Sequence, residues 1–241
     1  MKVVALIPAR YAASRFPGKL MQPLGNKTVI RHTVEATQST MLFDQVIVVT
    51  DSDEIETEIK NFGGICKRST RPYESGTDRI AEIAASMEVD LILNVQGDTP
   101  FIKKEQLAAL IKEFENPTVE VASLMQPIQD PKLIQEPSVV KVVTDLNNDA
   151  LYFSRSPIPY NRDKSAPTTY YEHIGVYAFR KSALLDFTKW PISALEATEK
   201  LEQLRYVAHG VKIRMVKTDY SSIAIDTPED LVRANIHLAN I

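Results

Sequence analysis

The stretch Val-Val-Ala-Leu-Ile-Pro-Ala-Arg-Tyr-Ala-Ala-Ser-Arg-Phe-Pro-Gly-Lys, residues 3–19, decides the fold expected for this chain. Its first five residues are apolar, mostly β-branched and closed by Pro8, which is typical of a buried parallel strand. The following loop carries three cations, Arg10, Arg15 and Lys19, and a Pro-Gly pair predicts a turn just before the lysine. A cationic loop after the first strand of an α/β sheet favours phosphate binding, although an ordinary solvated loop would have the same composition.

Two familiar phosphate-binding patterns are absent from this loop. Leu20 follows Lys19 and no glycine stands five residues before Gly18, so the spacing GxxxxGK[ST] is missing, as is GxGxxG. In this loop, charged side chains must therefore bind the phosphates that main-chain amides bind in those two patterns. Guanidinium groups suit this task because they bind phosphate oxygens through two hydrogen bonds.

The composition bounds the class of protein. The chain has 241 residues, 44% of them apolar and 24% charged, which suits one globular α/β domain. The net charge of −3 gives no basic footprint for nucleic acid.

Cys66 is the single cysteine, so no internal disulfide can form, and it is most simply a buried small hydrophobic residue. No signal peptide and no apolar run near the roughly 20 residues of a membrane span are visible, so we expect a cytoplasmic protein without a membrane contact.

Short apolar runs alternate with helical patterns along the first part of the chain. We expect strands at 3–7, 46–49, 65–67, 89–95 and 119–125, and helices at 27–39, 53–62, 77–87 and 103–114. This alternation predicts an α/β fold of the Rossmann-like kind, with a mostly parallel, doubly wound central sheet and helices on both faces.

The pattern changes near residue 125. We expect a hairpin from the strands 139–143 and 151–153, a long loop over 154–172, strands at 173–179, 213–216 and 222–225, and helices at 181–188, 193–206 and 227–240. Thr227 followed by Pro228 is a typical helix opening. These features predict a single domain over 1–241, with a nucleotide-binding half at about 1–125 and a half at about 126–241 that adds mixed strands.

Two aspartates directly follow apolar strands. Asp98 comes after the run 89–95 and Asp226 after Ile223-Ala224-Ile225. If the two strand ends are close, the carboxylates could together hold one Mg²⁺ that also takes phosphate oxygens. The alternative is that each aspartate caps the helix or turn that follows it, and Asp226-Thr227-Pro228 is a good helix start.

Several other polar residues have both a functional and a structural interpretation. The junction Ser75-Gly76-Thr77-Asp78-Arg79 could line a base or ribose, or could simply cap a helix. His173 at a strand start could be a catalyst or a satisfied structural histidine. Glu202-Gln203 could bind a ligand or lie on a solvated helix face.

Beyond these single features, an ordered set of motifs is present. It comprises Pro8-Ala9-Arg10 through Lys19, Ser75–Arg79, Asn94-Val95-Gln96-Gly97-Asp98, Val140–Val143, Tyr152-Phe153-Ser154-Arg155, His173–Tyr177, Leu201–Arg205 and Ile225–Asp230. From Met1 to about Ala234 the chain resembles the sugar-acid cytidylyltransferases, and most closely the 3-deoxy-manno-octulosonate (KDO) cytidylyltransferase, or CMP-KDO synthetase, family. The resemblance implies the nucleotide-diphospho-sugar transferase fold and a homodimer that uses part of the second half as its interface.

The resemblance also implies a role for each matching residue. The catalytic residues would be Lys19, Arg15, Asp98 and Asp226, with Asp98 and Asp226 holding Mg²⁺. The CTP-binding residues would be Ala9, Arg10, Ser14, Arg15, Lys19, Ser75, Gly76, Thr77, Arg79 and Gln96. The residues around KDO in the sugar-acid-binding half would be Arg155, His173, Tyr177, Glu202 and Gln203.

The expected reaction joins CTP and KDO to give CMP-KDO and diphosphate, activating KDO for lipopolysaccharide synthesis. Rival hypotheses are the same chemistry on an 8-amino KDO analogue or a sialic acid, a nucleotidyltransferase that uses GTP, and a non-catalytic nucleotide-binding protein. One departure from the family is visible: the family usually continues Gln-Gly-Asp with Glu-Pro, whereas this chain has Thr99-Pro100. If that glutamate orients a metal-bound water, metal affinity or substrate preference would differ here.

Overall fold

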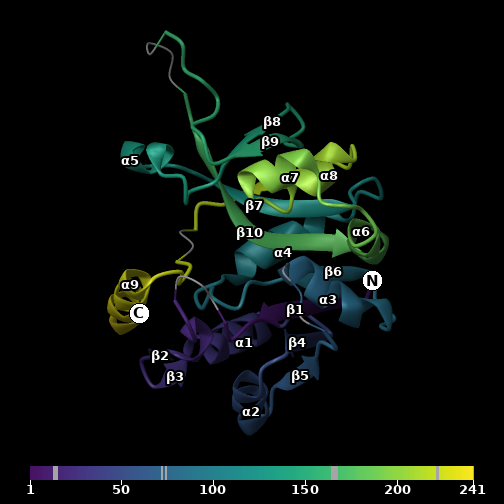
Figure 1. Cartoon of the computed structure of the whole chain (residues 1–241), viewed down its shortest axis with the longest axis vertical. Helices are drawn as coiled ribbons and strands as arrows, with labels where there is room; N and C mark the ends of the chain where they lie inside the picture. The colour runs from purple at the N-terminus through teal and green to yellow at the C-terminus, as the bar shows by residue number, and fades with distance from the viewer. Residues whose placement is uncertain (13–15, 72, 74, 164–167, 221–222, 241) are drawn as a thin grey trace. The chain divides into compact units, whose positions relative to one another are not determined.

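The computed structural model describes residues 1–12, 16–71, 73, 75–163, 168–220 and 223–240 (Figure 1). The chain divides into two compact units. The first comprises Met1–Ala108 and Ser222–Ile241, and the second comprises Ala109–Ser221. Helix α4 (Lys104–Glu113) begins in the first unit and ends in the second. The return of the C-terminal segment to the first unit is not visible in the sequence pattern, and the single domain stays a prediction.

The first unit is built on four parallel strands in the order β6 (Leu91–Asn94), β1 (Val3–Ala9), β4 (Gln45–Thr50) and β5 (Ile65–Arg68). All seven residues of β1 are buried, which explains the continuous apolar run. Burying one such Val, Leu or Ile side chain contributes about 1.5–3 kcal/mol. The strand runs two residues past the expected end at position 7, because pairing with β4 continues to Ala9 opposite Thr50.

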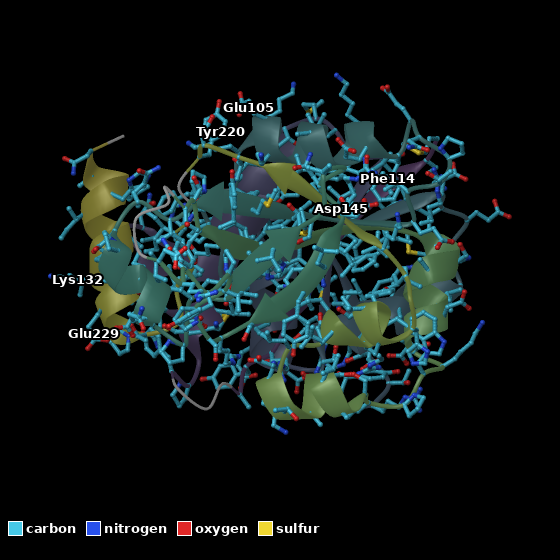
Figure 2. The ribbon with its side chains drawn as sticks, turned by 90° about the horizontal axis from the view of Figure 1, so that it is seen from above. Glu105, Phe114, Lys132, Asp145, Tyr220 and Glu229 are labelled. Atoms are coloured by element: carbon cyan, nitrogen blue, oxygen red, sulfur yellow. The ribbon has the colours of Figure 1, made fainter. Side chains whose placement is uncertain are left out.

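Helices and short elements complete the first unit. They are the 3₁₀ turn η1 (Lys19–Met21), the hairpin of β2 (Pro23–Leu24) and β3 (Lys27–Thr28), α1 (Val29–Ser39), α2 (Asp53–Asn61), α3 (Gly76–Ala85) and α9 (Pro228–Ala239). Hydroxyl caps begin the helices: Thr28 for α1, Ser52 for α2 and Ser75 for α3. Figure 1 shows α9 beside the β2–β3 hairpin, where the Gly25 N–H donates to Asn235 Oδ1 at 3.0 Å. Glu229, in the first turn of α9, is exposed and lies on the outside of the helix in Figure 2.

The second unit has mixed strands, as the change of pattern predicts. Its strands are β7 (Val121–Pro127), β8 (Lys141–Thr144), β9 (Ala150–Ser154), β10 (Tyr171–Arg180) and β11 (Ile213–Lys217). β10 is antiparallel to β7 and β8, β8 is antiparallel to β9, and β11 is parallel to β7. Its helices are α5 (Pro131–Gln135), α6 (Lys181–Phe187), α7 (Ala194–Glu199) and α8 (Leu204–Ala208).

Two sequence expectations are wrong. The helix expected over 193–206 is two helices, because Lys200 adopts the left-handed conformation (φ 55°) and ends α7. The strand expected over 222–225 is absent from its described residues, 223–225, which have no regular structure. Ile225 instead donates a single main-chain hydrogen bond, 3.0 Å, to the Asp98 carbonyl. Among the described residues, no helix has the length and apolar character that crossing a membrane requires.

Candidate active site

Lys19 forms the centre of a charged cluster in the first unit. Its ammonium donates to a carboxylate oxygen of Asp98 and, at 2.9 Å, to Oδ1 of Asp226. The three side chains are 16%, 19% and 42% exposed, respectively, so the cluster is partly screened from water. Burial disfavours the charged lysine, but the two carboxylates outweigh this effect and raise the pKa of Lys19 above its ordinary value. The ammonium is therefore charged at neutral pH, and the two aspartates do meet.

Local structure places each member of this cluster. Gly18, with φ of 66°, makes the left-handed turn that starts η1 at Lys19. Asp98 lies in a turn closed by Thr99, whose main-chain N–H and hydroxyl both donate to the Gln96 carbonyl, at 3.2 and 2.6 Å. A Cβ at Gly97 would lie 3.1–3.3 Å from Ile30, Leu20 and the Pro8 carbonyl, so the turn packs closely against β1 and α1 at this point.

The helix-cap alternative for Asp226 is not what the structure shows. Thr227 caps α9, because its hydroxyl accepts from the Asp230 N–H. Asp230 completes the capping box by accepting from the N–H groups of Asp226 and Thr227 at 3.0 and 2.9 Å. This leaves the Asp226 carboxylate turned toward Lys19 while its own main chain is held by the cap.

A polar cavity of about 280 Å³ contains this cluster. Its lining residues are Pro8, Arg10, Ala12, Phe16, Lys19, Leu20, Gln96, Gly97, Asp98 and Asp226. Arg10 is exposed at the end of β1, and Ala9 beside it is buried, so only the main chain of Ala9 could reach a ligand. The predicted residues Ser14 and Arg15 lie outside the described residues. Polar groups of both signs at the carboxyl end of parallel strands are suited to a phosphorylated ligand and its counter-ion.

The α3 junction serves largely to build the fold. The Ser75 hydroxyl accepts from the N–H groups of Thr77 and Asp78, so the capping interpretation of this serine is correct. Arg79 is only 1% exposed and donates to Ser69 Oγ at 2.7 Å and to Asp51 Oδ2 at 2.9 Å. The hydrogen bond from Arg79 is the main reason that the pKa of Asp51 is lowered. Arg79 also lines a pocket together with Arg10 and Asp51, so a structural role does not remove it from reach of a ligand.

A second group of predicted residues is assembled within the second unit. His173 Nδ1 lies 3.4 Å from the Gln203 amide nitrogen, and its Nε2 lies 3.0 Å from Ser123 Oγ. The rings of Phe153 and Tyr177 pack against the imidazole with centroids 5.0 and 5.3 Å away. Burial lowers the pKa of His173 to about 3, so the ring is neutral at physiological pH.

Tyr177 and Arg155 complete the predicted set. Burial, assisted by the charge of Glu202, raises the pKa of Tyr177 well above its ordinary value, so its phenol stays protonated. The Arg155 guanidinium donates to main-chain carbonyls of Pro137 and Glu199 at 2.8 Å and of Lys200 at 3.4 Å. It thereby ties the end of β9 to the end of α7.

Comparison with known proteins decides the family. The cytidylyltransferase family matches residues 4–213. A 3-deoxy-manno-octulosonate cytidylyltransferase of Christiangramia forsetii is 56% identical over 236 residues, covering 97% of this chain and 95% of that protein. The chain belongs to the 3-deoxy-manno-octulosonate cytidylyltransferase family. The enzyme of the same name from Flavobacterium johnsoniae is 54% identical over the full length of both chains.

A solved structure supports the fold of this cytidylyltransferase. It is described as CMP:2-keto-3-deoxy-manno-octonic acid synthetase complexed with CTP, and it is 37% identical over 100% of this chain and 99% of its own, with a TM-score of 0.94. The predicted fold class, an α/β fold of the nucleotide-diphospho-sugar transferase kind with a mostly parallel sheet, is confirmed by this match.

Two further residues of this cytidylyltransferase, Asp51 and Ser123, contact residues of the predicted sites. Asp51 directly follows the apolar strand β4, and the sequence pattern there predicts only the helix that begins at residue 53. Ser123 stands alone as a polar residue within the apolar run of β7 and is fully buried. A polar side chain inside a buried strand is a signal that could have found it, because such a group needs a partner.

Proposed function

We propose that this chain catalyses the reaction of CTP with 3-deoxy-D-manno-octulosonate to give CMP-KDO and diphosphate. The full-length similarity to enzymes of that name supports the reaction, and the structural match supports CTP as the nucleotide. The observation that carries the proposal is the cluster of Lys19, Asp98 and Asp226 in a polar cavity at the carboxyl end of β1.

The cationic loop serves the triphosphate. Arg10 is exposed beside the cavity, and Lys19 keeps its charge because its pKa is raised, so both can compensate phosphate charge. Charge on the departing diphosphate grows in the transition state, and a fixed ammonium then stabilises the transition state more than the bound substrate. Arg15 is proposed for the same task from the family motif alone.

Asp98 and Asp226 are suited to hold Mg²⁺. Two carboxylates reach one ammonium here, and Mg²⁺ is typically bound by one or two carboxylates together with substrate phosphates. Among the described residues, no group of three or more His, Cys, Asp or Glu side chains is arranged for a metal, so the nucleotide and water would supply the other ligands. When bound there, Mg²⁺ would stabilise negative charge on the phosphate and the sugar-acid oxygens as a Lewis acid.

The sugar acid is assigned to residues of the second unit. The Gln203 amide and the protonated Tyr177 phenol offer hydrogen bonds, and the neutral His173 that holds the amide adds no competing charge. Glu202 would accept from sugar hydroxyls. Arg155 is assigned a supporting role, because its guanidinium already binds three carbonyls that shape this region.

The chemistry is an in-line displacement. The anomeric hydroxyl oxygen of the acid forms a bond to the α-phosphorus of CTP, and its proton passes to water. The bond from that phosphorus to the bridging oxygen of the β-phosphate breaks, and diphosphate leaves. Such phosphoryl-group transfer needs positioning and charge stabilisation and no covalent enzyme intermediate. The product then serves lipopolysaccharide assembly, and the cytoplasmic location and homodimer stay predictions.

A diphosphate-release assay tests the proposal. The protein is incubated with Mg²⁺, one nucleotide and one acid, using CTP or GTP with KDO, 8-amino KDO or a sialic acid. Release from CTP that requires KDO is the expected result. Preferential use of another acid or of GTP would change the substrate, and absence of release with every pair would favour the non-catalytic alternative.

A further inference from the structure

The hydroxyl of Ser123 lies within hydrogen-bond distance of two main-chain carbonyl oxygens and one histidine ring nitrogen of the second unit. It is 2.9 Å from the Val176 carbonyl, 3.1 Å from the Ile174 carbonyl and 3.0 Å from His173 Nε2. Its position in β7 faces an irregularity in β10, where the register shifts between Ile174 and Tyr177. Such a bulge displaces carbonyl groups from the regular ladder, and the serine hydroxyl supplies a donor there.

The chemistry of these neighbours fixes the direction of each hydrogen bond. Both carbonyl oxygens can only accept, so the single hydroxyl proton of Ser123 points to one of them. A lone pair of Ser123 Oγ then faces His173 Nε2, and that nitrogen must carry a proton. If the hydroxyl proton pointed to the imidazole instead, Oγ lone pairs would face two carbonyl oxygens at 2.9 and 3.1 Å.

The other nitrogen of the ring is set by this choice. Because the imidazole is neutral, a proton on Nε2 leaves a lone pair on Nδ1. The Gln203 amide must then present its NH₂ group to Nδ1, as the 3.4 Å contact shows. Among the described residues this amide makes no other hydrogen bond, so its carbonyl oxygen stays available as an acceptor for a substrate hydroxyl.

We propose that Ser123 is a positioning residue that holds His173 in its Nε2–H tautomer and thereby fixes which end of the Gln203 amide faces the sugar acid. The aromatic contacts with Phe153 and Tyr177 hold the plane of the ring, and Ser123 decides where its proton lies. The consequence for catalysis rests on the proposed role of Gln203 in acid binding. The tautomer itself does not depend on that role.

Nitrogen-15 NMR of the full-length protein with labelled histidines tests the tautomer directly. The chain has four histidines, and a His173→Gln variant identifies the signals of His173. In the wild type at pH 7.5 we expect a protonated Nε2 and a bare Nδ1. In Ser123→Ala we expect a mixture of tautomers or a shift to Nδ1–H. A bare Nε2 in the wild type, or an unchanged tautomer in Ser123→Ala, would overturn the proposal without any activity measurement.

Kinetics of the same variants test the consequence. Ser123→Ala should raise the KM for the sugar acid about ten-fold while the KM for CTP stays within two-fold, because only the acid-facing amide loses its orientation. Thr37→Val is the matched control, since it also removes a fully buried hydroxyl that donates to a carbonyl, but in α1 of the first unit. Equal changes in both KM values, or the same kinetic change in Thr37→Val, would show a merely structural role. If the wild type turns over no acid, the proposed function fails. The NMR experiment then still tests whether Ser123 sets the tautomer of His173.

Discussion

Replacing Lys19 by methionine removes one charge from the centre of the charged cluster and keeps most of the length of the side chain. In the wild type the ammonium binds both Asp98 and Asp226. In the variant the two carboxylates face each other without a cation. Two effects should follow: a loss of transition-state stabilisation in catalysis, and a less stable protein whose empty carboxylate pair binds a divalent cation more readily.

The size of the stability effect follows from the geometry and exposure of the cluster. Two unit charges about 4 Å apart interact with about 4 kcal/mol at an effective dielectric constant of 20. Asp226 is 42% exposed, so solvent screening must reduce this figure. We expect the free energy of unfolding to fall by about 1–3 kcal/mol, which for a chain of this length corresponds to a Tm lower by roughly 5 °C.

Magnesium should reverse this loss in the Lys19→Met variant. A ligand at one hundred times its Kd stabilises the folded state by about 2.7 kcal/mol. In the wild type the ammonium competes for the same carboxylate oxygens, so without nucleotide the same Mg²⁺ concentration should raise Tm less. Turnover should not recover with Mg²⁺ in the same way. We expect kcat of Lys19→Met to be about ten-fold or more below that of the wild type, because the lysine charge acts mainly in the transition state.

Thermal unfolding with and without Mg²⁺, followed by diphosphate release, measures both effects. Lys27→Met is the matched control, because Lys27 also forms an ion pair, with Glu35 at 2.5 Å, but does not line the cavity. An equal Mg²⁺-induced Tm shift in wild type and Lys19→Met would refute the competition. Near-normal turnover of purified Lys19→Met would refute the catalytic role of the lysine.

Three further changes test other parts of the argument. Asp98→Asn and Asp226→Asn should each impair turnover and Mg²⁺ binding, and the double variant should be little worse than the worse single one, whereas independent roles predict additive losses. The pKa of His173 is lowered from 6.5 to about 3, so the unfolded state binds more protons between these pH values. Urea denaturation should therefore show the free energy of unfolding decreasing as the pH is lowered from 6.5 toward 3, by up to about 1.4 kcal/mol per pH unit. His173→Gln should lose this part of the slope, and an equal slope in that variant would contradict the assignment. Arg205→Met should lower the free energy of unfolding by about 3–5 kcal/mol, because it leaves the buried Glu196 carboxylate without its guanidinium partner; a loss under 1 kcal/mol in urea would show the pair to be dispensable.

The strands β1 and β4 were predictable because their burial is almost continuous. All seven residues of β1 and five of the six residues of β4 are buried, so their apolar runs identify them without any tertiary information. The point at which one polar helix ends and the next begins cannot be predicted in this way. The α7–α8 break depends on a left-handed Lys200, and lysine carries no sequence signal for that conformation. The five-residue helix α5 was missed for a similar reason, since it has no buried residue and therefore no periodic pattern.

The site was predictable only in part, because its contacts are long-range. The sequence predicts that the carboxylates of Asp98 and Asp226 lie together only if each follows a strand and the two strand ends are close. The described residues 223–225 before Asp226 form no strand. The two carboxylates meet because one main-chain hydrogen bond and a helix cap hold the segment before α9. Lys19, which joins them, is 79 and 207 residues away along the chain, a separation that no local pattern encodes.

Thr99 takes part in the turn that presents Asp98. Its side chain is 5% exposed and donates to the Gln96 carbonyl, so it closes the turn that presents Asp98. An ionised glutamate has no proton to donate, and it could not make this bond. The turn therefore has an internal donor at this position, and the cluster holds two carboxylates against one ammonium. Metal binding in this chain must then depend more heavily on the phosphates of the nucleotide than on protein oxygens, which predicts that Mg²⁺ binds weakly until CTP is present.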